Sequence, residues 1–221
     1  MVEVENVERM ALENSALARE IKDLAQKLKS AAKLEFERAK AREHLCKKEI
    51  ELAEARETLA EKNKNLVERK NKVKDILKFT EGELNSQKKT AIYFEQVAKV
   101  QKKIAETNRK IAESEESISK DRGKLADEKM DVAKGRENLA KKQLAYVKAV
   151  KAKKPQEQIL KAESEYLKLH KELLAEKKDV LDKEKNIKEN EDKLADLRKR
   201  LSQNISEREK IRHAGLPSEM S

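Results

Sequence analysis

Side chains that could carry out chemistry are few and widely spaced in this sequence. The chain has one cysteine and three histidines. His44 and Cys46 are two residues apart, which on a helix places them about 200° apart around the axis, so they cannot share a metal ion. His170 and His213 each stand alone, and the sequence has no glycine-rich phosphate loop. We therefore expect no catalytic residues, no cofactor and no metal site, and we expect that the protein is not an enzyme.

Charged residues make up 43% of the chain, and aromatic residues only 3%. Over most of the sequence, acidic and basic side chains alternate at short intervals, which is typical of the solvated face of a long helix. The carboxylates are therefore interpreted as helix-supporting charges rather than paired catalytic acids.

A seven-residue repeat is the strongest pattern in the sequence, and it predicts the helices on which these charged residues lie. Large apolar residues recur at every seventh position of the central segment, and a small residue nearly always follows each one. The large positions are Val97, Ile104, Ile111, Ile118, Leu125, Val132, Leu139 and Tyr146, and the small ones include Ala98, Ala105, Ala112, Ser119, Ala126, Ala133 and Ala140. This spacing is typical of a helix in a left-handed coiled coil.

The same repeat occupies two flanking segments. In the first, it runs from Leu17 to Val73 and places Cys46 at a small position, so Cys46 is interpreted as a small residue of the helix seam. In the second, it runs from Ile159 to Leu201. Each segment is long enough for a helix of many turns.

Two breaks separate the three segments. Val73 and Val97 are 24 residues apart, three heptads plus three, so the phase of the repeat changes between them. Glycine, asparagine and serine in this interval disfavour a helix interior, and we predict a bend or short turn within residues 79–90. The alternative is one continuous helix with a stutter. The second break is predicted at 153–156, because Pro155 is not tolerated inside a helix but suits the start of a new one.

The predicted fold class is all-α, with three long antiparallel coiled-coil helices in an elongated bundle, in which the large apolar residues of each repeat face the other helices. We expect one domain over residues 1–213, with helices at about 12–78, 91–153 and 155–212, followed by a tail at 214–221. The first 16 residues are expected to be a frayed lead-in.

A second copy of the chain is expected to complete the core. The apolar stripe covers only two or three positions in seven, which buries little surface. We therefore predict a homodimer, held in part by Leu173, Val180 and Leu194 of the third helix.

Lysines concentrate in one place without acidic neighbours. Residues 141–154 contain six lysines and no aspartate or glutamate, namely Lys141, Lys142, Lys148, Lys151, Lys153 and Lys154. This run ends at the turn before Pro155, so it is expected to project from the end of the helix pair. Such a cluster suits an anionic phospholipid surface, where each basic residue contributes about 1 kcal/mol. No nucleic-acid motif or aromatic stacking platform accompanies the charge, which argues against nucleic acid as a partner.

The residues around this turn carry a resemblance. The run from Gln143 to Tyr146, the lysines, Pro155 and the run from Ile159 to Tyr166 resemble the distal tip of BAR domains, both of the amphiphysin type and of the fungal eisosome core proteins. The similarity covers about 25 of 221 residues. BAR helices usually have wider apolar faces and more aromatic residues than this chain. The resemblance implies a crescent-shaped dimer that binds curved membrane through the lysines of the tip.

Two functions remain open at this point. One is a BAR-like membrane scaffold, and the other is a cytoskeletal or scaffolding coiled-coil protein that binds other proteins, including other coiled coils, or assembles into filaments. No apolar run approaches the ~20 residues needed to cross a bilayer. A cytoplasmic protein that associates with membranes peripherally is the expectation.

Overall fold

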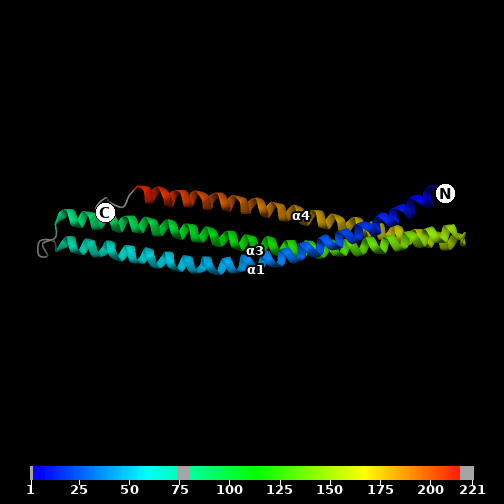
Figure 1. Ribbon diagram of the computed structural model, residues 1–221, viewed down its shortest axis with the longest axis horizontal. Helices are drawn as coiled ribbons and strands as arrows, with labels where there is room; N and C mark the ends of the chain where they lie inside the picture. The colour runs from blue at the N-terminus through cyan, green and yellow to red at the C-terminus, as the bar shows by residue number, and fades with distance from the viewer. Residues whose placement is uncertain (1, 74–79, 215–221) are drawn as a thin grey trace. The chain divides into compact units, whose positions relative to one another are not determined.

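Three long helices account for almost all of the residues that the computed structural model describes, which are 2–73 and 80–214. They are α1 (Val2–Lys72), α3 (Glu81–Lys151) and α4 (Gln156–His213), and no strand occurs within the described residues (Figure 1). The prediction of an all-α chain with three helices is confirmed.

The chain divides into two compact units, and each helix contributes one segment to each unit. Unit 1 comprises Met1–Phe36 and Ser117–Glu191, and unit 2 comprises Glu37–Glu116 and Asp192–Ser221. In unit 1, α1 and α3 run in opposite directions, because Glu8 pairs with Lys151 and Glu35 pairs with Arg122. In unit 2, the pairs Arg42–Glu115 and Lys64–Glu95 show the same antiparallel order.

The beginning of α1 differs from the sequence prediction. The helix begins at Val2 rather than near residue 12, and the expected frayed lead-in is helical. The reason is that the buried stripe already starts there: Val7 and Ala11 are 5% and 1% exposed. Its last helical residue is Lys72, and the predicted end at residue 78 lies outside the described residues.

The first break lies earlier than predicted. Helix α3 begins at Glu81, not near residue 91, so residues 81–90 are helical rather than a turn. Thr80 caps this start: its backbone N–H donates to Glu83 Oε2 at 2.9 Å, and the Glu83 N–H donates to Thr80 Oγ1 at 3.3 Å. This reciprocal capping box satisfies free N–H groups of the first turn. Leu84, at 3% exposed, extends the buried stripe by two heptads toward the N-terminus of α3. The alternative of one continuous helix is therefore wrong.

The second break lies at Pro155, as predicted. Helix α3 ends at Lys151, two residues before the predicted end, and α4 begins at Gln156, one residue after the predicted start. Helix α4 ends at His213, one residue beyond the predicted end.

Alanine, not leucine, makes the inward face of α1. Every seventh residue from Ala11 to Ala60 is buried: Ala11, Ala18, Ala25, Ala32, Ala39, Cys46, Ala53 and Ala60. The leucine before most of these positions points outward, with Leu24 63% and Leu52 51% exposed. The expectation that the large residues of this stripe face the other helices is wrong. Small side chains let two helix axes approach closely, which leaves no space for leucine at the contact.

From Ile111 to Ala140 of α3, both positions of the repeat are buried. Ile118, Leu125 and Leu139 are 4%, 6% and 1% exposed, and the small residues after them are equally enclosed. Cys46 is buried and free, as expected for a small seam residue, and burial raises the pKa of its thiol, with Glu49 adding to the effect.

The apolar core of unit 1 uses part of the surface that was assigned to a second chain. Val132, Leu139 and Leu173 form a buried cluster, and Ile21, Tyr166, Leu169 and Val180 pack against it. Leu194, in unit 2, is 7% exposed. Leu173 and Leu194 are therefore buried within a single copy, and Val180 is partly buried, so they are not a free dimer surface.

Candidate functional site

The lysine-rich turn between α3 and α4 lies entirely in unit 1 and has a defined backbone. The Lys153 N–H donates to the Val150 carbonyl at 3.0 Å, and the Lys154 N–H donates to the Ala149 carbonyl at 3.1 Å. These two bonds form a Schellman motif, which needs a left-handed residue just beyond the helix end. Lys153 supplies it with φ 47°, although glycine is the usual residue at this position.

Helix α4 starts immediately after the turn. The carbonyl of Pro155 accepts hydrogen bonds from the N–H groups of Gln158 at 2.9 Å and Ile159 at 3.3 Å. Because proline fixes φ near the helical value and donates no hydrogen bond, it suits this boundary between two helices. Lys153 and Lys154 are thus held in a tight turn rather than in a long loop.

Side-chain contacts next to the turn join α3 both to α4 and to α1. The rings of Tyr146 and Tyr166 lie 5.3 Å apart between centroids, and Gln143 is 4% exposed. Asn14 donates to Gln143 Oε1 at 3.2 Å, and Arg136 donates to Asn14 Oδ1 at 2.9 Å. A polar layer therefore joins α1 and α3 close to the lysine-rich turn.

All six predicted lysines are exposed, but they differ in their partners. Lys142 pairs with Glu165 at 2.7 Å, and its hydrogen bond lowers the pKa of that carboxyl. Lys151 pairs with Glu8 at 2.6 Å. Within the part of the chain that the structure describes, the other four make no ion pair: Lys141, Lys148, Lys153 and Lys154.

This arrangement is suited to binding anionic groups. The four ammonium groups without ion-pair partners carry positive charge in water, where they can attract phosphate or carboxylate groups. The sequence did not reveal which two lysines are paired internally, because Glu8 and Glu165 lie on other helices. The antiparallel order of the helices could have indicated that Glu8 and Glu165 lie near this turn.

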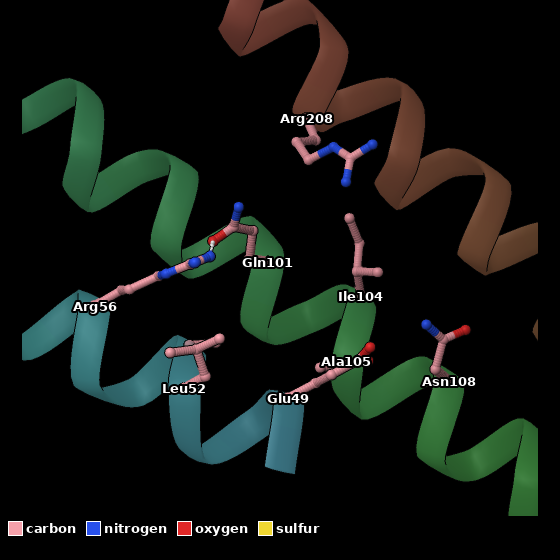
Figure 2. Close-up of a pocket in the computed structure, with 9 residues that line it drawn as sticks. Glu49, Leu52, Arg56, Gln101, Ile104, Ala105, Asn108 and Arg208 are labelled. Carbon is pink, nitrogen blue, oxygen red and sulfur yellow. Dashed lines mark hydrogen bonds between the residues drawn. The ribbon is translucent and has the colours of Figure 1, made fainter. Parts of the chain in front are cut away.

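A row of three cavities lies along the contact of α1 with α3 in unit 2. The central one has a volume of about 370 Å³, and the others measure about 340 and 220 Å³. Figure 2 shows Leu52 and Arg56 of α1, Gln101 and Ile104 of α3, and Arg208 of α4 around the central cavity. Arg56 donates to Gln101 Oε1 at 3.0 Å across it. Sequence reasoning missed these cavities, because it expected the leucines to be inside the core.

Charged bridges tie the three helices within each unit. In unit 1, Arg122 of α3 contacts Glu35 of α1 at 2.5 Å and Glu191 of α4 at 2.7 Å. In unit 2 the charges are reversed: Glu115 of α3 contacts Arg42 of α1 at 2.7 Å and Arg198 of α4 at 3.0 Å. These groups have partners on two helices, so we interpret them as structural.

Residues 2–73 and 80–214 are the part of the chain that the structure describes. That part of the chain holds no group of three or more His, Cys, Asp or Glu side chains placed to bind a metal ion. None of the helices described there is long and apolar enough to span a bilayer. Comparison of the chain with protein-family models, with curated proteins and with solved structures found no match.

Proposed function

We propose that the protein is a non-enzymatic, membrane-associated scaffold that binds anionic phospholipid through the turn between α3 and α4. In this proposal the helices form a BAR-like coiled-coil homodimer in the cytoplasm, with one basic turn from each copy on the membrane. The supporting observation is the group of four exposed lysines without ion-pair partners among the described residues, in a stretch of chain that contains no acidic residue.

The backbone of the turn adds a second argument. Lys153 is a non-glycine residue with positive φ, the only one within the described residues. A strained position at which a lysine replaces the favoured glycine is a reason to suspect function. Two such turns in a dimer would add their attractions, which strengthens binding to a surface without new contacts.

A scaffold for other proteins is the second candidate. The observation that favours it is the exposed leucine at heptad spacing on α1 and α4, for example Leu45, Leu59 and Leu174, at 62%, 59% and 51%. Exposed apolar side chains in a row mark surfaces for protein contact.

The test is sedimentation with vesicles of phosphatidylserine and phosphatidylcholine at low salt. The variant carries Glu at four positions, Lys141, Lys148, Lys153 and Lys154. Since each basic residue near the surface is worth about 1 kcal/mol, we expect at least a tenfold loss of binding. The parent protein should lose binding as salt rises, because screening weakens attraction between exposed charges.

A matched control distinguishes the effect of losing these four lysines from the effect of lowering the net charge of the protein. Four exposed lysines of α4 make no ion pair with described residues, and their change to Glu alters the net charge equally: Lys171, Lys178, Lys185 and Lys188. We expect this control to keep binding within about threefold of the parent. Equal losses in both variants would show that net charge alone drives adsorption. A parent protein that does not bind at low salt would leave the protein scaffold as the better function.

A further inference from the structure

The three cavities of unit 2 repeat with the heptad. Each is lined by one leucine of α1 and the small residue after it, and by one small residue of α3. The small α3 residues of neighbouring cavities are seven positions apart in the sequence. We name this row the seam groove, and its lining includes Leu45, Cys46 and Ala112, then Leu52, Ala53 and Ala105, then Leu59, Ala60 and Ala98. At 1.5 Å rise per residue, successive cavities lie about 10.5 Å apart.

The groove is open because the chain's own α4 does not fill it. In unit 1, Ile21 of α1 packs against the cluster that contains Leu173 of α4. The position four heptads after Ile21 is Glu49, and the position four heptads after Val180 of α4 is Arg208. Both of these polar side chains line the central cavity. Polar groups thus replace the apolar side chains that close the corresponding contact in unit 1.

A second row of exposed leucines has the same spacing. Helix α4 presents Leu160, Leu167, Leu174 and Leu181, which are 53%, 44%, 51% and 63% exposed. We name these four residues the α4 stripe. Its repeat equals that of the seam groove, so one leucine could enter each cavity in turn, as knobs enter holes in a coiled coil.

We propose that the α4 stripe of a second copy docks into the seam groove. Leu45, Leu52 and Leu59 line the groove, Leu66 lies one heptad further along α1, and each of the four is more than half exposed. Together with the stripe, these eight leucines would remove on the order of 800 Å² per copy from water, which is what a stable interface buries on each partner. A twofold dimer would make the contact twice, once with each groove.

A pairing of α1 with α1 of a second copy is the competing arrangement. It would cover the leucines beside the groove but leave the four leucines of the α4 stripe exposed. Docking of stripe into groove covers both rows with one repeated contact, and the observations therefore favour it. The inference rests on the dimer in the proposed function and not on membrane binding.

The experiment uses opposite charges in the two surfaces of the full-length chain. The groove variant carries Leu52→Lys and Leu59→Lys, and the stripe variant carries Leu167→Glu and Leu174→Glu. Each variant alone should be monomeric by light scattering at about 10 µM. The dissociation constant of its dimer should be at least 100-fold higher than that of the parent. An equal mixture should form a dimer, because lysine in one groove then meets glutamate in the other chain's stripe. Circular dichroism confirms that each variant remains helical.

The control places the same charge on exposed leucines outside both surfaces, with Leu24→Glu and Leu34→Glu, both 63% exposed in the parent. This control should remain a dimer. A stripe variant that stays dimeric while the groove variant dissociates would overturn the inference and support pairing of α1 with α1. A mixture that does not associate, or a parent that is monomeric, would also overturn it. Vesicle binding by a monomeric parent would show that the membrane function survives without this interface.

Discussion

Replacing Lys153 with glycine should raise stability and lower membrane binding at once. Lys153 has φ 47°, a conformation that costs a residue with a side chain roughly 1–2 kcal/mol. Glycine removes this cost. It also gives the unfolded chain more conformational freedom, which lowers the free energy of unfolding by roughly 0.5–1 kcal/mol. The net gain should be about 0.5–1 kcal/mol, which corresponds to a rise of about 2 °C in the melting midpoint of a chain of this size.

Thermal unfolding followed by circular dichroism measures the gain, and two variants isolate its cause. Lys153→Ala loses the same charge but keeps the strained backbone, so it should melt like the parent. Lys154→Gly adds glycine where φ is not positive, so it should melt lower. Binding to anionic vesicles should weaken equally in Lys153→Gly and Lys153→Ala, because both lose one ammonium group. If the glycine variant is no more stable than the alanine variant, the argument from backbone strain is refuted.

The remaining predictions concern the core, the pH dependence and the start of α3. Leu139→Ala, at a position 1% exposed, should lower the free energy of unfolding by about 2–5 kcal/mol. Leu34→Ala, at 63% exposed and outside both proposed docking surfaces, should change it by less than about 0.5 kcal/mol, and urea denaturation compares the two. Burial, with a contribution from Asp131, raises the pKa of Glu176, whose Oε2 is buried without a hydrogen-bond partner among the described residues. Because the folded pKa lies above the unfolded one, the charged form opposes folding at neutral pH. Glu176→Gln should therefore raise the melting midpoint at pH 7, and the advantage should shrink as the pH falls toward about 4. A gain that is the same at every pH would contradict this reasoning. Thr80→Ala should cost about 1 kcal/mol through loss of the cap and speed amide exchange in the first turn of α3, and unchanged exchange would show that the cap is not needed.

Helix number and the proline boundary could be predicted because strong local signals fix them. The heptad repeat indicates helix over dozens of residues, and Pro155 excludes an uninterrupted one. The start of α3 was missed although its signal was present. Thr80 followed by Glu83 is a capping box, but Gly82 between them drew the interpretation toward a turn. An exposed glycine in the first turn of a long helix costs too little to end it.

Which residues of the repeat face inward could not be read from spacing alone. Leu52 and Ala53 recur with the same seven-residue period and lie about 100° apart on the helix, so either can face a neighbour. The choice depends on how closely α1 approaches α3, which is a property of two helices and not of one. For the candidate site, the sequence located the lysines, but only the packed helices show that Glu8 and Glu165 neutralise Lys151 and Lys142.

The alanine stripe has a further consequence for the alignment of α1 and α3. Every heptad of the stripe offers almost the same small surface, so a slip of one heptad, about 10.5 Å, would preserve nearly all of these contacts. Apolar packing therefore holds the helices together without choosing among these registers. Contacts that occur once can make the choice, as a single polar residue does in a coiled coil. In unit 1, Asn14 meets Gln143 and Arg136, and Glu35 meets Arg122; a slip would break all of these bonds. Adhesion and alignment are thus encoded by different residues, and the few polar side chains between α1 and α3 determine which of many equivalent alignments is the native one.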